Sequence, residues 1–224
     1  MAQRPVFVAN LKGRRLVAPI ELEFNWAAGL APSQKKKNIR SLHLAAETKR
    51  GLTNVLEIST KSESALGVAM SAFNLQLITP SGLQDSIENL FQASKVFEQG
   101  GPFVDLLGKS SLRAKTDLRL THSGALRAFQ LEGVDWPIQP KTAFYDWLYL
   151  NALQQQPDLA KQLVNYNGFT DIEFNPAHSL NCQAASAALY VSLLKRNELD
   201  ATLASAQSFL ARLAAADSFP ESIT

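Results

Sequence analysis

The sequence predicts a mixed α+β fold, a single domain with a small sheet surrounded by helices and a mainly helical C-terminal third. Amino-terminal segments alternate apolar and polar residues as strands do, whereas later segments repeat apolar residues at helical spacing. The two patterns mix without a regular βαβ period and without an internal repeat, which disfavours a doubly wound sheet. The 224 residues, 46% of them apolar and 19% charged, are typical of one globular domain with peripheral additions.

The predicted strands are rich in β-branched and aromatic residues, which suit a pleated and half-buried surface. In the second of them, Ile20, Leu22 and Phe24 alternate with polar residues. The expected strands are Val6–Val8, Leu16–Phe24, Val55–Ser59, Val68–Ile78 and Leu126–Leu131.

The predicted helices have recognisable starts and ends. Lys35–Lys49 follows the start signal of Pro32 and precedes Gly51, which can end a helix. Asp85–Glu98 carries Ile87, Leu90, Phe91 and Phe97 on one side and precedes two glycines. The later helices are expected at Lys141–Gln154, Pro157–Asn165, Asn181–Lys195 and Asp200–Ala215.

Composition also limits the compartment and the class of partner. Cys182 is the only cysteine, so the chain forms no internal disulfide. No run approaches the roughly 18 apolar residues of a membrane-spanning helix, and the first ten residues lack a secretory pattern. We therefore expect a cytoplasmic protein without membrane contact.

The net charge is only +2, but the basic residues are unevenly placed. They gather in two stretches, which are either solvated helix faces or surfaces for nucleic acid. The stretches are Lys35, Lys36, Lys37 and Arg40, and Lys109, Arg113, Lys115, Arg119 and Arg127.

Several familiar signatures of enzymes are absent from the sequence. It contains no phosphate-binding glycine loop, no Cys-x-x-Cys pair and no Gly-x-Ser-x-Gly motif. His178 and Cys182 stand four residues apart, but no further histidine or cysteine is nearby to complete a metal site. We expect neither a metal nor a cofactor.

The helix predicted at Asp85–Glu98 carries a row of polar residues, since Glu88, Gln92 and Lys95 recur at i, i+4 and i+7. At the border of a buried face such a row can project into a cleft, where burial raises the pKa of a carboxyl and lowers that of a lysine. The alternative is a capping box at Asp85 and Glu88 with an ordinary solvated stripe behind it.

A second polar cluster lies at Phe169–Asn175. Alternation places Asp171, Glu173 and Asn175 on one side of a predicted strand. Asn181 and Gln183 follow at a predicted helix start, whose free N–H groups favour an anion such as phosphate. The alternative is a capped helix after an edge strand.

Four segments in order resemble the NADAR family of N-glycosidases, over roughly residues 68–196. Ser86–Phe97 resembles the family's S-V-E-H-Y-F-Q-A-x-K-F signature. Phe73 and Asn74 fall in a segment similar to its F-S-N-F strand, and Asp135-Trp136, Asn151-Ala-Leu and Gln156-Pro157 resemble its D-W, A-L and Q-x-P helix pair. Ile172-Glu173 and Asn181 resemble its V-E and G-x-N segment.

The amino-terminal third looks like the subgroup of NADAR antitoxins that accompany DarT-type DNA ADP-ribosyltransferase toxins. Phe24-Asn-Trp, Gln34-Lys-Lys-Lys and Ser41-Leu-His43 carry this likeness. It implies that the chain removes ADP-ribose from guanine bases in DNA and so reverses the action of the toxin. The expected partners are ADP-ribosylated DNA and a cognate DarT-type toxin.

The resemblance implies that Glu88 and Lys95 are the leading catalytic residues, with Asp171 and Glu173 as further candidates. The general family has an aspartate in a D-x-x-W-G loop after its V-E strand, which this chain lacks. Either Asp171 or Asn175 would take its place.

Further residues are expected to bind the substrate. Phe73 or Trp136 would stack on a base, the alternative for each being an ordinary core residue. Lys109 and Arg113, or the helix start at Asn181, would hold the diphosphate. The other substrate-binding candidates are Asn74, Gln92, Asn175 and Gln183, and the candidates for DNA binding are Lys35, Lys36, Lys37 and Arg40.

Two other functions stay open at this point. One is a non-catalytic module that binds ADP-ribose or the toxin, and the other is an N-glycosidase that acts on a small phosphorylated metabolite. The expected organisation is an amino-terminal region of strands and basic helix at residues 1–60, a NADAR-like catalytic domain at 61–216 and a frayed tail at 217–224.

Overall fold

The computed structural model describes residues 1–29, 31–175, 179 and 181–217. Residue contacts divide the chain into two compact units, of which unit 1 comprises Met1–Ser71 with Pro157–Thr224 and unit 2 comprises Ala72–Gln156. Both units combine helices with small sheets, so the predicted α+β class is confirmed. The domain boundaries expected at residues 60 and 216 stay a prediction.

Unit 1 is built on a four-stranded sheet in the order β2-β1-β9-β3. The long strands β1 and β2 pair antiparallel over their full length, from Ala2 opposite Phe24 to Ala9 opposite Val17. The short strands β3 and β9 pair parallel. The four strands are β1 Ala2–Ala9, β2 Val17–Phe24, β3 Val55–Glu57 and β9 Gly168–Thr170. The strands predicted at Val6–Val8, Leu16–Phe24 and Val55–Ser59 are thus confirmed as β1, β2 and β3.

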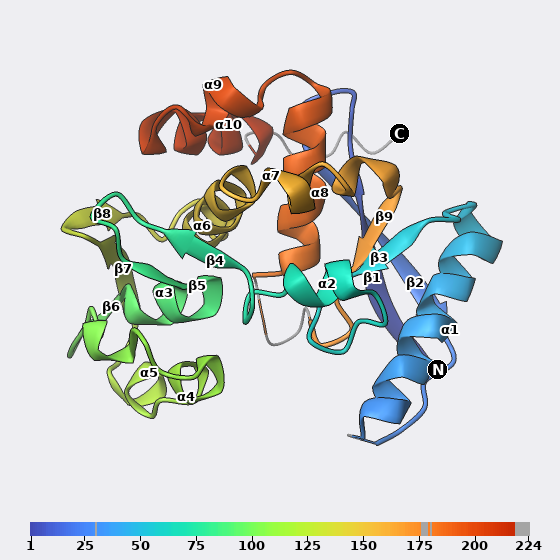
Figure 1. Ribbon diagram of the computed structural model, residues 1–224, viewed down its shortest axis with the longest axis horizontal. Helices are drawn as coiled ribbons and strands as arrows, with labels where there is room; N and C mark the ends of the chain where they lie inside the picture. Colours follow the sequence, from blue (N-terminus) through green and yellow to red (C-terminus); the bar gives the residue numbers. More distant parts are fainter. Residues whose placement is uncertain (30, 176–178, 180, 218–224) are drawn as a thin grey trace. The chain divides into compact units, whose positions relative to one another are not determined.

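Helices α1, Pro32–Arg50, and α8, Gln183–Lys195, flank this sheet (Figure 1). Gly51 ends α1 in the left-handed conformation, with φ +67°, and confirms the predicted stop. The core between α1 and the sheet is apolar and almost wholly buried. It includes Val6, Leu22, Phe24, Ile39, Leu42, Ala46 and Ile172.

The remaining elements of unit 1 correct three predictions. The strand predicted at Val68–Ile78 is wrong over its first half, because residues 65–69 form helix α2. The helices predicted at 157–165 and 200–215 are each broken into two shorter ones. Short apolar runs fit a strand and a buried helix equally well, which explains the first error. The elements are α2 Ala65–Ala69, α7 Pro157–Ala160, the 3-10 helix η2 Leu163–Asn165, α9 Leu199–Leu203 and α10 Ala206–Asp217.

Unit 2 contains a two-stranded sheet, β4-β5, and a three-stranded antiparallel sheet, β6-β7-β8. Only β7 and β4 were predicted as strands, β4 as the last part of the strand expected at Val68–Ile78. The bounds are β4 Gln76–Ile78, β5 Gln84–Ser86, β6 Lys95–Phe97, β7 Leu126–Leu131 and β8 Val134–Trp136.

The central helix of unit 2 is α3, which packs against α4 and α6. Figure 1 shows α3 beside β5, with α4 and α5 below it. The helix predicted at residues 141–154 is confirmed as α6. The helical elements are α3 Ile87–Ala93, η1 Val104–Leu106, α4 Ser111–Lys115, α5 Arg119–His122 and α6 Ala143–Gln154.

The helix predicted at Asp85–Glu98 is wrong at both ends. Asp85 lies in strand β5, α3 stops at Ala93, and Lys95–Phe97 forms strand β6. The chain leaves the helix because β6 pairs with β7, where Lys95 stands opposite Phe129. This pairing between distant segments overrides the local helical pattern.

Two further expectations concern the C-terminal tail and contact with a membrane. The predicted frayed tail lies outside the described residues from residue 218 onward. Among the helices that are described, none combines the length and the apolar character needed to cross a membrane.

Candidate functional site

The start of α3 is fixed by a buried aspartate. The Asp85 carboxylate accepts hydrogen bonds from the Ser86 and Gly108 amides at 2.7 Å each and from Asn89 Nδ2 at 2.9 Å. Ser86 is the N-cap, since its hydroxyl accepts from the Asn89 amide at 3.2 Å. The predicted capping box of Asp85 and Glu88 is therefore replaced by a Ser86 cap, and α3 is anchored to the loop at Gly108.

Glu88 lies in the first turn of this anchored helix and is only 6% exposed. Its backbone amide donates to the Ala72 carbonyl at 2.9 Å. Its carboxylate oxygen Oε1 accepts from Gln92 Nε2 at 2.9 Å and lies 4.0 Å from Lys115 Nζ. A buried carboxylate is thus held by one amide and one ammonium group.

Lys95 reaches the same region from strand β6 rather than from the helix, so the inferred i+7 relation along one helix face is wrong. Its Nζ lies 4.7 Å from the centre of the Phe91 ring, which is on α3. Burial lowers the pKa of Lys95 to about 8, with Glu88 acting to raise it and Lys115 to lower it. A larger share of this amine is therefore neutral at physiological pH than for an ordinary lysine.

Lys115, at the end of α4, also lies next to Glu88, and the sequence did not reveal a role for it. Its Nζ lies 5.3 Å from the centre of the half-buried Phe73 ring. The Ser111 hydroxyl, on the same helix, is 3.4 Å from the Phe73 carbonyl. The only sequence signal for Lys115 was its membership of the second basic stretch. We call Phe73, Glu88, Gln92, Lys95 and Lys115 the Glu88 cluster.

Two polar atoms, one in the cluster and one on the residue that precedes Lys95, have no hydrogen-bond partner among the described residues. These are Gln92 Oε1 and Ser94 Oγ, on side chains that are 7% and 2% exposed. A buried acceptor without a donor is costly unless a ligand or water supplies one. Gln92 thus offers an acceptor next to the Glu88 carboxylate.

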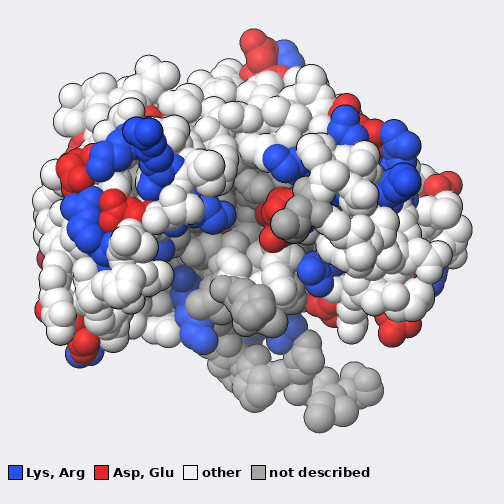
Figure 2. All heavy atoms as spheres, turned by 90° about the horizontal axis from the view of Figure 1, so that it is seen from below, with Lys and Arg blue, Asp and Glu red and all other residues white. Residues whose placement is uncertain are grey.

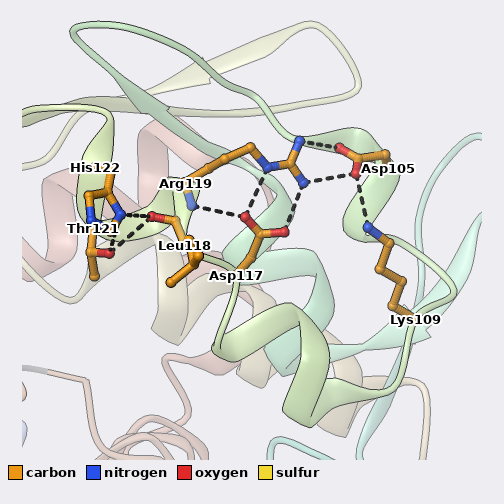
Figure 3. Close-up of polar contacts among 7 residues, drawn as sticks. All are labelled: Asp105, Lys109, Asp117, Leu118, Arg119, Thr121 and His122. Atoms are coloured by element: carbon orange, nitrogen blue, oxygen red, sulfur yellow. Dashed lines mark hydrogen bonds and ion pairs between the residues drawn. The ribbon is translucent and has the colours of Figure 1, made fainter.

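Lys109, expected to hold a diphosphate, is engaged in an ion-pair network in the structure. Figure 3 shows Asp105 between Lys109 and Arg119, and Arg119 continuing to Asp117. The Lys109 Nζ to Asp105 Oδ2 distance is 2.9 Å, and Arg119 donates to both aspartates. These bonds hold the pKa of Asp105 well below its usual range.

The second basic stretch is therefore partly neutralised. Figure 2 shows Lys and Arg atoms interspersed with Asp and Glu atoms at the end of the view where α4 and α5 lie. Arg113, the other predicted diphosphate ligand, is exposed on α4.

The aromatic and amide candidates of unit 2 lie in different environments. Trp136 is 4% exposed and packs against Phe144 and Trp147, with ring centres 5.5 and 5.2 Å away. It is a core residue of unit 2 and does not join the cluster. Asn74 is exposed next to Phe73.

Unit 1 contains the second predicted group, centred on Asp171. Strand β9 ends at Thr170, so the interpretation of Asp171, Glu173 and Asn175 as one face of a strand is wrong. The chain turns instead, and the Asp171 carboxylate accepts from the Glu173 amide at 3.0 Å. Burial raises the pKa of Asp171 to about 8, and the nearby Glu57 carboxylate adds to this effect.

Glu57, at the end of β3, was missed by the sequence analysis. It is 2% exposed and accepts from the Thr170 and Ser59 hydroxyls at 2.7 Å each and from the Ile172 amide at 2.9 Å. Burial raises the pKa of Glu57 despite these bonds. His43 Nε2 lies 2.9 Å from the Thr170 hydroxyl, and burial lowers the pKa of His43 to about 4.

The other candidates of unit 1 lie around Asp171 or on α1. Gln183 donates to Asp171 Oδ2 at 3.0 Å from the first turn of α8. That helix begins two residues after the predicted start at Asn181, whose Oδ1 is buried without a partner among the described residues. Asn175 follows the turn, and its carbonyl accepts from the Ser179 amide.

The predicted DNA-binding residues on α1 differ in their availability. Lys35 pairs with Glu173 at 3.1 Å, and Arg40 pairs with Glu63 at 2.8 Å. Lys36 and Lys37 are exposed. Glu173, expected as a catalytic residue, is thus an ion-pair partner of the basic helix.

The described part of the chain holds no group of three or more His, Cys, Asp or Glu side chains suited to a metal ion. His178, considered with Cys182, lies outside the described residues.

Comparison with known families decides the assignment. Residues 2–221 match the model of the NADAR-DarT1 family, described as DarT1-associated NADAR antitoxins. The chain belongs to this family. No curated protein matches the sequence.

In this NADAR antitoxin the motif that carried the resemblance spans three elements. It starts at the Ser86 cap, contains α3, and ends in β6. Its acidic and basic members belong to a helix and a strand, and the charge of Glu88 acts to raise the pKa of Lys95. The other NADAR-like candidates, Asp171 and Glu173, belong to unit 1.

Proposed function

We propose that this NADAR antitoxin is an N-glycosidase that removes ADP-ribose from guanine bases in DNA and so reverses the action of a DarT-type toxin. The observation that carries the proposal is the Glu88 cluster, where a buried carboxylate lies close to a lysine whose pKa is lowered to about 8. The match to DarT1-associated antitoxins supports the role in toxin reversal.

Glu88 supplies the charge that cleavage at an anomeric carbon requires. The bond to the base breaks through a state in which positive charge develops on the sugar. A carboxylate that is preorganised by Gln92 and Lys115 stabilises that charge without rearranging at the moment of reaction.

Lys95 supplies a nucleophile. The neutral amine attacks the anomeric carbon, and the bond between that carbon and the guanine nitrogen breaks. The electron pair of the broken bond leaves with the base. The proton that the amine loses balances the one that the base takes up. Opening of the sugar ring gives an imine on Lys95, and water hydrolyses this imine to free ADP-ribose and the amine.

Gln92 and Phe73 complete the substrate contacts within unit 2. The free Gln92 Oε1 would accept a hydrogen bond from a sugar hydroxyl, which would satisfy its buried acceptor. The half-buried Phe73 ring presents a surface on which a base can stack.

The proposal is tested with oligonucleotides that carry ADP-ribose on guanine or on thymine, with release followed by mass spectrometry. We expect release from guanine alone, and a loss of at least about 100-fold in Glu88→Gln, the scale of removing one transition-state stabiliser. Glu98→Gln, an exposed carboxylate of the same unit, should retain activity. Borohydride added during turnover should leave an ADP-ribosyl adduct on Lys95.

The alternatives give different results in the same experiments. If Glu88→Gln at equal abundance still protects cells from the toxin, a binding module is favoured over an enzyme. If only a small ribosylated phosphate compound is cleaved, the protein acts on a metabolite. An active enzyme that never acquires the borohydride adduct rules out the imine route.

A further inference from the structure

Two ammonium groups stand near one buried carboxylate in the Glu88 cluster, and they are not equivalent. Lys115 Nζ lies 4.0 Å from Glu88 Oε1. Lys95 forms no ion pair with a carboxylate of the described residues, and its ammonium instead lies 4.7 Å from the centre of the Phe91 ring. The carboxylate is thus paired with the more exposed of the two lysines.

The position of Lys115 is set by contacts of α4. The Ser111 hydroxyl lies 3.1 Å from the hydroxyl of Ser86, the N-cap of α3, and 3.4 Å from the Phe73 carbonyl. Both helix α4 and the loop at Phe73 are therefore fixed relative to the start of α3. The Phe73 ring then holds the Lys115 ammonium at 5.3 Å, although 55% of this side chain is exposed.

We propose that Lys115 is a positioning residue of the Glu88 cluster, which pairs with Glu88 so that the amine of Lys95 stays free to react. The assignment of the reaction rests on the function proposed above. The pairing itself does not, because it concerns the protein without substrate.

The sign of the effect follows from the groups around Lys95. The charged groups that act on its ammonium are Glu88 on α3 and Lys115 on α4, and its partner across the sheet, Phe129, is uncharged. Removing the Lys115 charge removes its repulsion of the Lys95 ammonium. It also leaves Lys95 as the one lysine of the cluster that interacts with the Glu88 carboxylate. Both changes favour the protonated form of Lys95 and raise its pKa.

The test measures the Lys95 amine directly. Trace labelling with acetic anhydride over a pH series, read at Lys95 by peptide mass spectrometry, gives its titration midpoint in the protein without substrate. In Lys115→Met we expect the midpoint to move up by roughly half to one pH unit. Lys115→Arg, which keeps the charge, should stay close to the parent protein, as should Lys141→Met, a change of an exposed lysine elsewhere in unit 2.

The second readout is the pH dependence of single-turnover release from ADP-ribosylated guanine oligonucleotides. Lys115→Met should lose activity at neutral pH and regain it at higher pH, with the same displacement as the labelling midpoint. A purely structural loss would instead lower activity by the same factor at every pH.

Each outcome decides one of the two proposals. An unchanged or lower labelling midpoint in Lys115→Met overturns the role of Lys115, as does a Lys115→Arg protein that behaves like Lys115→Met. If the midpoint rises but even the parent protein releases no ADP-ribose, the role of Lys115 stands and the proposed function fails.

Discussion

Asp171 and Glu57 are two carboxyl groups of unit 1 whose pKa values are both raised, chiefly because burial disfavours their charged forms. The Glu57 charge adds to the rise for Asp171, and the Glu173 charge adds to the rise for Glu57. Thr170, Ser59 and Ile172 donate to Glu57, yet these bonds do not offset the burial. Such a pair is more stable when it carries fewer than two negative charges.

The raised pKa of Asp171 gives a definite pH dependence of stability. The unfolded carboxyl ionises near its ordinary pKa of 3.8, whereas the folded one keeps its proton to about 8. The contribution of Asp171 to folding stability is therefore fully present below pH 3.8, and it is lost as the pH rises toward about 8. We expect Asp171→Asn to raise the melting temperature relative to the parent protein increasingly between about pH 5 and pH 8.

Asp158→Asn is the matched control in the same unit, because Lys161 lowers the pKa of this exposed aspartate. Its effect should be confined to more acidic pH. A melting-temperature difference for Asp171→Asn that stays constant over the whole range contradicts the raised pKa.

Single residues were predictable where a motif marked them and unpredictable where only the fold brings them together. Glu88 and Gln92 stand four apart on one helix, and the structure shows the hydrogen bond that this spacing implies. Glu57 lies more than a hundred residues before its partner Thr170, so no local pattern reveals that they meet. Lys115 was visible only as part of a basic stretch.

At the scale of elements, the error at the end of α3 is the most informative. Phe97 completes an apolar row with Ile87 and Leu90, which favours a continuous helix. The structure ends the helix at Ala93 because the next residues pair with β7, some thirty residues further along the chain. A window of local sequence does not contain that pairing.

The return of the chain after β6 depends on Gly101, which has a φ of +93°. A Cβ at this position would lie 2.1 Å from the backbone oxygen of Lys95. We expect Gly101→Ala to lower the free energy of unfolding by roughly 2 to 4 kcal/mol, since backbone strain and a steric clash combine. Denaturant unfolding measures this loss, and the strand that carries Lys95 should be displaced.

Gly82 provides the control, because its φ of +87° is similar but nothing lies within 4 Å of its added Cβ. Gly82→Ala should cost only about 1 to 2 kcal/mol, the strain of the left-handed conformation alone. Equal losses for the two variants would show that the close approach to Lys95 is unimportant.

At the scale of the whole molecule, the α+β class followed from composition and from mixed periodicities. The division into units did not, because the chain returns to unit 1 at Pro157 after completing unit 2. Membership of unit 1 depends on β9 pairing with β1 and β3, which are far away in the sequence. From the sequence, only the resemblance to the NADAR family, whose segments occur in the same order along the chain, indicated that these distant regions belong to one fold.

The basic helix α1 yields a prediction about DNA binding that does not depend on the base sequence. Lys36 and Lys37 are exposed, whereas Lys35 and Arg40 are paired with glutamates. Replacing both exposed lysines with alanine should weaken binding to all DNA sequences and reduce the slope of log affinity against log salt by about 2. Fluorescence anisotropy over a salt series measures both effects.

Cleavage of a free ADP-ribosylated nucleoside should be unaffected by the same double replacement, because that substrate has no DNA backbone. Lys161→Ala, in the same unit but paired with Asp158, serves as the control for a lost positive charge. Equal losses on the free nucleoside and on DNA would argue that these lysines act on folding rather than on phosphates.

The junction at Ser94 separates the acid of the Glu88 cluster from its amine, since one belongs to α3 and the other to a three-stranded sheet. The two groups therefore depend on different parts of unit 2 for their support. A mutation in the β7–β8 hairpin, whose strand β7 pairs with β6, would displace the amine, whereas the carboxylate would keep its contacts with Gln92 and Lys115. Loss of function by mutation in this hairpin is thus expected to be selective, because it displaces the nucleophile and leaves the carboxylate in place.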